Sequence, residues 1–379
     1  MSVSLDPRPA AGSLLPEPSS RARAAWWVVV LVLAAGYAAL RLTMNEQYDV
    51  APWSALVQLR APLPFGHRVL VPLLVRPLLA LGLPLPLALG LWETAATAGL
   101  AGAVAWTLRP HGGARLGMAA GLLALLTLPW LFLLPHRWPI FYPWDTPAMA
   151  LLVAGIGAID RERWGLAMVL ALLAALNRES AILLPAAALL LAPPRASSWR
   201  PELARVAGLL AVVLVGRVAI AIALPDNPGP PVHFTVGNGG YRVLNNLHWL
   251  AEPRHLLLTL PSLAGWPLAW ALLAGQVGPR WRRLWLLAWA QTAGLLVVAN
   301  IYEPRAFGEV LALALLPTAI GVARWLGLQA KPVEPERPWW LAALDRHGVW
   351  LVVVAFVAFV LALRQWELLP VAQWPMPRT

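Results

Sequence analysis

Acidic and basic side chains interrupt a chain that is otherwise strongly apolar, and chemistry is possible where they do so. The stretch 144–192 contains three apolar runs: Asp145 begins the first, and Arg178 and Glu179 lie in the polar break between the second and third. A charge held at the centre of a bilayer costs about 2.5–3.5 kcal/mol. An acid and an Arg–Glu pair kept among such runs therefore indicate a candidate site. The alternative interpretation is that they are ordinary polar residues at helix ends.

Two other segments supply candidate residues. The segment after the first apolar run contains Glu46, Asp49 and Arg68, and a late segment contains Glu303 and Arg305. Carboxylates of this kind serve as general bases, and guanidinium groups bind phosphate in bidentate fashion.

Motifs for other kinds of site are weak. The histidines lack metal-ligand spacing, so we predict no metal site among them. The GNGG sequence at 237–240 lacks the Lys-Ser/Thr step and strand context of a phosphate-binding loop, and we interpret it as a turn. Glu93 and Arg217 lie inside apolar runs, where helix–helix pairing or snorkelling is the favoured interpretation.

Composition predicts an all-α polytopic membrane protein. The 379 residues are 59% hydrophobic and only 12% charged, and several apolar runs approach or exceed 18 residues. The absence of cysteine excludes disulfides and thiolate chemistry. The net charge of +11 is almost entirely arginine, which in a membrane protein is a topology signal and does not indicate a nucleic-acid partner.

The positive-inside rule selects a topology of about 11 spans, within a range of 10–12. With the N-terminus cytoplasmic, every short basic cluster from Arg109 to Arg346 falls on the cytoplasmic side, and the candidate site residues fall on the outer side. The predicted spans are 25–42, 86–108, 116–134, 144–158, 166–176, 181–192, 204–224, 256–277, 284–300, 310–326 and 349–363.

Two regions leave alternatives open. Segment 43–85 has six prolines and arginines at 60, 68 and 76, so we predict amphipathic helices at the outer interface; a true span over 69–83 would invert all later topology. The runs 166–176 and 181–192 are short for a roughly 30 Å core. We favour a re-entrant pair meeting at Asn177–Ser180 over one long helix that holds Arg178 and Glu179 in mid-membrane.

These boundaries give one transmembrane domain at 25–363. We expect a disordered cytoplasmic tail at 1–24, a long outer loop at 225–255 and an outer tail at 364–379. The Ala/Leu/Arg/Pro bias and this topology indicate a multi-pass protein of a bacterial inner membrane.

Three stretches resemble the GT-C superfamily of integral-membrane glycosyltransferases, of the type that depends on polyprenyl-phosphate sugars. They are the acidic NEQYD after the first helix, the block DRERWGLAMVLALLAALNRESAILLPAAALLL, and EPRAFGEVLALALLP before a late helix. PFGHRVLVPLL and NRES also resemble uncharacterised bacterial membrane proteins related to that superfamily. The acids here are spaced Glu-x-x-Asp, whereas the family has an adjacent pair.

The resemblance implies sugar transfer from a lipid-linked donor to an acceptor at the outer membrane face. It implies Asp49 or Glu46 as the base, with Asp49 ranked first, and Arg68, Arg178 and Arg305 as phosphate partners. Glu179 and Glu303 then belong to the substrate-binding set. Asp145 would orient the acceptor or bind a divalent metal, although many members of the superfamily need no metal or other cofactor. Membrane lipids are the other expected partners.

Two further functions stay open. A transporter or flippase predicts charges along a path through the spans and often an internal repeat, and Glu93 and Arg217 are its best support. The other is a membrane protein without catalytic activity. The oligomeric state, sugar and acceptor are not encoded in these patterns.

Overall fold

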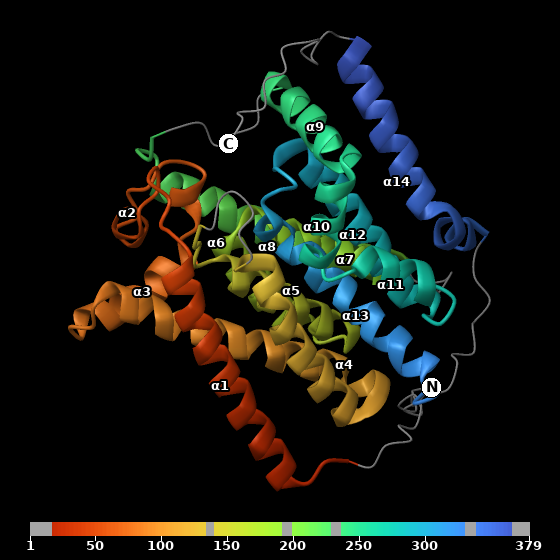
Figure 1. The fold of residues 1–379 in the computed structure, drawn as a ribbon, viewed down its shortest axis with the longest axis horizontal. Coiled ribbons are helices and arrows are strands. Elements are labelled where there is room, and N and C mark those ends of the chain that lie inside the picture. Colours follow the sequence, from red (N-terminus) through yellow and green to blue (C-terminus); the bar gives the residue numbers. More distant parts are fainter. Residues whose placement is uncertain (1–16, 134–139, 192–198, 229–235, 330–338, 366–379) are drawn as a thin grey trace.

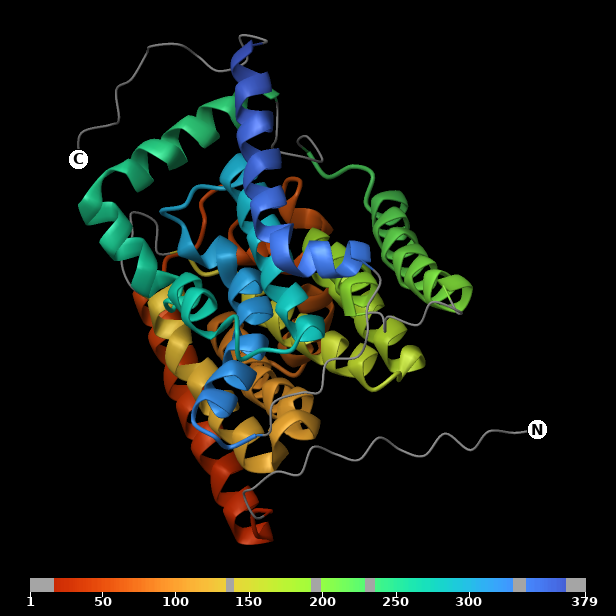
Figure 2. The ribbon, with the colours of Figure 1, turned by 90° about the vertical axis from the view of Figure 1, so that its right-hand side faces the viewer.

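Helices make up all the regular structure that the computed structural model describes, which comprises residues 17–133, 140–191, 199–228, 236–329 and 339–365 (Figures 1 and 2). The helices are α1 (Ser20–Met44), α2 (Trp53–Val57), α3 (Leu70–Ala80), α4 (Leu85–Phe132), α5 (Asp145–Asp160), α6 (Trp164–Asn177), α7 (Leu183–Leu191), α8 (Trp199–Ala223), α9 (Val236–Ala251), α10 (Pro253–Ser262), α11 (Trp266–Leu273), α12 (Pro279–Val298), α13 (Gly308–Trp325) and α14 (Trp339–Gln365), with the 3-10 turns η1 (Phe65–His67), η2 (Glu179–Ile182) and η3 (Pro304–Phe307). The predicted all-α class is confirmed.

Five helices in the described part of the chain are long and apolar enough to cross a membrane, namely α1, α4, α8, α13 and α14. The number becomes six if α10 and α11 form one broken span. Such helices are consistent with a multi-pass membrane protein. The remaining predicted spans are helical, but they are shorter or more polar.

Helix α4 contains two antiparallel halves joined at Gly112–Gly113. Gly113 has φ 78°, a backbone region that favours glycine. A Cβ added at Gly117 would lie 2.4 Å from the carbonyl oxygen of Ala105, so the second half folds back against the first. The two glycines at 117 and 121 let the backbones approach closely, as small residues do between membrane helices.

Segment 43–85, which the predicted topology places outside, forms short helices. Helix α3 has 11 residues, about 16 Å at 1.5 Å per residue, which is too short to cross a bilayer core. It buries Val71 and Val75 and exposes Leu73 and Leu74, which favours the interfacial interpretation over a span at 69–83.

Three local predictions have clear outcomes. The polar break is present, because Arg178 is extended (φ −163°, ψ 155°) between α6 and η2. The predicted span 256–277 is not one continuous helix: α10 and α11 are bent by 78° near Gly265, which has φ 64°. The predicted turn at 237–240 is wrong, since α9 occupies those residues. The described part of segment 225–255 is mostly helical, and its place in an outer loop stays a prediction. Glycine and asparagine have low helix propensity, so the amphipathic helix α9 was not predicted from this segment.

Helices α5 and α13 lie at the centre of the molecule. In the segment Pro304–Trp325, which contains α13, 83% of the most apolar stretch of 18 residues is buried. Glycines allow the close packing, because a Cβ at Gly155 would meet Leu184 and one at Gly308 would touch Met149. By contrast, α14 lies along the outside of the molecule (Figure 2), and only 6% of its most apolar stretch of 18 residues is buried. The predicted tails 1–24 and 364–379 lie largely outside the described residues.

Candidate functional site

A buried ionic network connects four helices at one end of the molecule. Arg178 donates to Asp145 at 3.2 Å and lies 3.3 Å from Glu309. Asp145 also accepts from Arg41 at 3.3 Å, and Arg41 donates to Glu93 at 2.6 Å. The side chains of Arg41 and Glu93 are fully buried. The network therefore runs from the polar break into two candidate spans, α1 and α4.

Helix ends explain why these side chains meet. Asp145 begins α5 and Glu309 lies in the first turn of α13, where the positive end of the helix dipole favours a carboxylate. Arg178 follows the last residue of α6, where the dipole favours a cation. Ser180 adds a hydrogen bond of 2.6 Å to Glu309. The break in the chain thus places one guanidinium between two helix N-termini.

A second ionic group lies at the more exposed side of the break. Glu179 accepts from Arg68 and Arg217, each at 3.2 Å. The Glu179 side chain is 42% exposed, whereas that of Arg68 is 11% exposed. Together with the buried network, four arginines balance four carboxylates.

Three stacked aromatic rings hold two of the arginines. Tyr142 stacks on Trp144 with ring centroids 4.8 Å apart, and Phe65 stacks on Tyr142 at 5.6 Å. The guanidinium of Arg68 lies 4.7 Å from the Trp144 ring, and that of Arg305 lies 4.2 Å from the Tyr142 ring. Both Nε atoms are buried and have no hydrogen-bond partner among the described residues. The aromatic rings therefore hold two cations, Arg68 on Trp144 and Arg305 on Tyr142.

Burial also sets the ionisation of this region. It raises the pKa of the Tyr142 hydroxyl, so that this group stays protonated at neutral pH. Burial lowers the pKa of Arg68, and Glu179 opposes that effect. An arginine remains charged after such a shift.

The structure brings most of the predicted site residues together. Asp145 and Arg178 are in contact, as are Arg68 and Glu179. The pair Glu303–Arg305, at 2.7 Å, joins the site because Arg305 stacks on Tyr142. These residues come from segments that are far apart in the sequence.

The two predicted bases lie beside this group and do not contact it. The backbone oxygen of Glu46 accepts from the Phe141 amide at 2.8 Å, and its side chain is exposed. Asp49 lies exposed in the next turn and makes no hydrogen bond or ion pair with any residue that the structure describes. Tyr48, between them, packs on Phe65 and Tyr142, which keeps the loop against the aromatic stack. Their role as bases stays a prediction.

Sequence reasoning did not include Arg41, Thr146, Ser180 or Glu309 in the site. The signal for Arg41 was its spacing: Val30, Ala34, Tyr37, Ala38 and Arg41 form one buried face of α1. Of the two interpretations for Glu93 and Arg217, helix–helix pairing fits Glu93, which accepts from Arg41 of α1; Arg217 of α8 instead donates to Glu179 in the turn η2.

The site is closed. The void beside Arg178, Ser180 and Glu309 has a volume of about 10 Å³, room for at most one water molecule. Among the described residues, no group of three or more His, Asp or Glu side chains is arranged to hold a metal ion. The predicted topology also places His136 and Arg137, between the spans 116–134 and 144–158, on the outer face; both lie outside the described residues.

No protein-family model, curated protein or solved structure matches this chain. Its function is therefore inferred from the chemistry of its side chains.

Proposed function

We propose that this protein is a membrane glycosyltransferase of the GT-C type, which transfers a sugar from a polyprenyl-phosphate carrier to an acceptor at the outer face of a bacterial inner membrane. The observation that carries the proposal is that three arginines lie against the segment 142–145: Arg305 on the Tyr142 ring, Arg68 on the Trp144 ring and Arg178 on the Asp145 carboxylate. The proposal includes about 11 spans, a cytoplasmic N-terminus and a GT-C fold.

The arginines suit a phosphate leaving group. As the bond between the sugar C1 and the phosphate oxygen breaks, the polyprenyl phosphate takes the electron pair and gains negative charge. Arg68 and Arg305 each retain an unpartnered Nε, and their carboxylate partners are partly exposed. A phosphate can therefore displace those carboxylates with less cost than at fully buried pairs.

The exposed acids of the first outer segment suit the acceptor side. The acceptor hydroxyl forms the new bond to C1 and loses its proton, which a nearby carboxylate can accept. Asp49 is exposed and has no partner among the described residues, so its oxygens are free for this role. In this proposal the more buried Asp145 holds Arg178 and Arg41 in position.

Transport is the second candidate, and one observation favours it. Arg41 and Glu93 form an ion pair within two candidate spans, where a transporter would keep charges. Farther along α5, however, the buried residues Met149, Leu152, Val153, Ile156 and Ile159 are apolar. The described network thus ends near one face, which fits interfacial chemistry better.

Sugar transfer by the purified full-length protein tests the proposal. A panel of polyprenyl-phosphate sugars is supplied with membrane-lipid acceptors, and Asp49→Asn and Arg68→Gln are measured beside the wild type. We expect Asp49→Asn to lower kcat by about 10²–10⁴-fold, the usual contribution of a general base. Loss of Arg68 is expected to lower it by about 10²–10³-fold.

Two matched variants control for the charge changes. Asp226→Asn removes another exposed acid, and Arg60→Gln removes another exposed arginine of the first outer segment. Both should transfer sugar at the wild-type rate. Unchanged transfer in Asp49→Asn would exclude this base and direct the test to Glu46→Gln. Substrate uptake into proteoliposomes without transfer would establish the transport candidate in its place.

A further inference from the structure

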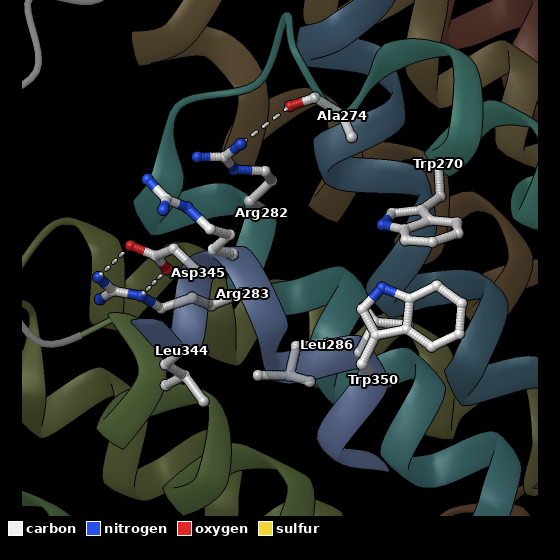
Figure 3. Close-up of a pocket in the computed structure, with 10 residues that line it drawn as sticks. Trp270, Ala274, Arg282, Arg283, Leu286, Leu344, Asp345 and Trp350 are labelled. Atoms are coloured by element: carbon white, nitrogen blue, oxygen red, sulfur yellow. Dashed lines mark hydrogen bonds and ion pairs between the residues drawn. The ribbon is translucent and has the colours of Figure 1, made fainter. Parts of the chain in front are cut away.

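A second charged cavity lies at the opposite end of the molecule, where α11, α12 and α14 meet. Its volume is about 250 Å³. Figure 3 shows side chains that line it. Arginines and an aspartate form one side, and two tryptophans face them from the other. The principal lining residues are Trp270, Arg282, Arg283, Asp345, Arg346 and Trp350.

The charges in this cavity do not balance. Asp345 accepts from Arg283 in bidentate fashion, at 2.7 and 3.1 Å, so that pair satisfies itself. The only hydrogen bond that Arg282 makes within the described residues is a long one of 3.5 Å to the Ala274 carbonyl, and its Nε is buried without a partner. Arg346 is exposed and has no ion pair in the part of the chain described. Among the residues that the structure describes, two guanidinium groups therefore lack an anion.

The wall formed by α14 has an exposed, apolar outer face. Only 6% of the most apolar stretch of 18 residues in α14 is buried, and the Trp350 side chain is 66% exposed. Large apolar side chains continue from the cavity along the exposed face of the same helix; they are Leu351, Val353, Val354, Val357, Phe359 and Leu361. A ligand bound here would thus lie with one end among arginines and the other along an apolar surface.

We propose that this cavity binds the phosphate headgroup of an anionic phospholipid from the leaflet that the sequence predicts to be cytoplasmic. Arg282 and Arg346 bind the phosphate, because guanidinium groups form charge-assisted, bidentate bonds with it. Trp270 and Trp350 lie at the level of the glycerol backbone, as tryptophan does at membrane interfaces. The acyl chains lie along α14.

A lipid fits this site better than a free phosphate ion. Basic pockets between membrane helices bind anionic headgroups, and the volume suits a headgroup while the acyl chains stay outside. The inference is independent of sugar transfer, since none of its residues belongs to the candidate site near Asp145.

Lipid retention by the purified full-length protein tests this assignment. Native mass spectrometry of the detergent-solubilised protein measures how much phosphatidylglycerol and phosphatidylcholine remain bound after equal additions. The wild type is compared with the double variant Arg282→Gln/Arg346→Gln. Arg163→Gln serves as the matched control, because it removes an exposed arginine from the same predicted face outside the cavity.

We expect the wild type to prefer phosphatidylglycerol and the double variant to bind it about 25-fold more weakly, or about fivefold for each arginine removed. Arg163→Gln should bind as the wild type does. Added phosphatidylglycerol should also raise the Tm of the wild type but not that of the double variant, which separates lost binding from misfolding.

Three results would overturn the proposal. One is unchanged phosphatidylglycerol binding in the double variant. Another is an equal loss in Arg163→Gln, which would assign the preference to the basic face as a whole. The third is displacement of the lipid by millimolar inorganic phosphate, which would make the cavity a site for a free anion.

Discussion

Arg41 and Glu93 are a fully buried ion pair whose desolvation is partly compensated by further hydrogen bonds. Besides Glu93, Arg41 donates to the hydroxyl of Thr146 at 2.8 Å, to the Tyr142 carbonyl and to Asp145. Its guanidinium also lies 4.2 Å from the Phe132 ring. Burying two charges is costly, and these additional hydrogen bonds offset part of that cost, although Arg41 Nε and Glu93 Oε2 are buried without a partner among the described residues.

Replacing one member of this pair should therefore lower the free energy of unfolding more than replacing both members. We expect Arg41→Met to lower the free energy of unfolding by about 3–5 kcal/mol, because Glu93 would stay buried without its counter-charge. The double variant Arg41→Met/Glu93→Leu should recover part of that loss. Thermal unfolding in one detergent measures both, and simple additivity of the two single effects would contradict this coupling.

Glu179 occupies the position at which a phosphate would meet Arg68 and Arg217. Because Glu179 is partly exposed, its pairs with these arginines contribute little stability. We expect Glu179→Gln to bind a polyprenyl phosphate about two- to fivefold more tightly, since the anion no longer competes with a carboxylate. Binding is measured by titration of the purified protein, with Glu252→Gln, another exposed acid, as the control. Weaker binding would mean that Glu179 itself contacts the ligand.

The sequence located charged residues better than it located their partners. Asp145, Arg178 and Glu179 stood out because they interrupt apolar runs. Arg41 did not stand out, because an arginine at the end of a span resembles an interfacial anchor. Its partners lie 52 and 104 residues away, and one chain carries no signal of such distances.

At the scale of elements, the close packing of the two halves of α4 depends on Gly117 and Gly121. A Cβ at Gly117 would lie 2.4 Å from the carbonyl oxygen of Ala105, whereas one at Gly99, in the same helix, meets nothing within 4 Å. We expect Gly117→Ala to lower the Tm, because the halves must separate. Gly99→Ala should leave the Tm unchanged or raise it, because alanine favours helix by about 1 kcal/mol. Thermal unfolding compares them, and equal effects would contradict the close packing.

Hydrophobic runs predicted where helices lie more reliably than how they bend. The runs at 25–42 and 310–326 match α1 and α13 closely, since apolar length dominates there. The bend between α10 and α11 was missed because Ala264 and Gly265 both take positive φ, which no composition signal marks. Helix α9 was missed because its sequence is rich in glycine and asparagine.

At the scale of the molecule, polar clusters lie at both ends of α5. Asp145 begins the helix, and Asp160 ends it with His111 at 2.7 Å and Arg280 at 2.9 Å. The helix between them spans about 22 Å, and its buried side chains there are mostly apolar. Polar ends and an apolar middle are the arrangement that a bilayer requires.

The predicted orientation is directly testable because the chain has no cysteine. Val50 and Gly165 are exposed on opposite predicted faces, so each can carry a single cysteine. In intact cells, a membrane-impermeant thiol reagent should label Val50→Cys and leave Gly165→Cys unlabelled until the membrane is opened. The reverse pattern would invert the topology and place the candidate site inside the cell.

The bond between Arg178 and Glu309 also imposes an order on biosynthesis. The two residues are 131 positions apart, so the ribosome reaches Glu309 roughly 10 s after Arg178. During that interval Asp145 can bind Arg178. The bonds that Arg178 and Ser180 donate to Glu309 form only after α13 has been made. The site is therefore completed only after α13 has been translated, and a nascent chain that stalls before Gly308 is inserted with this network still unfinished.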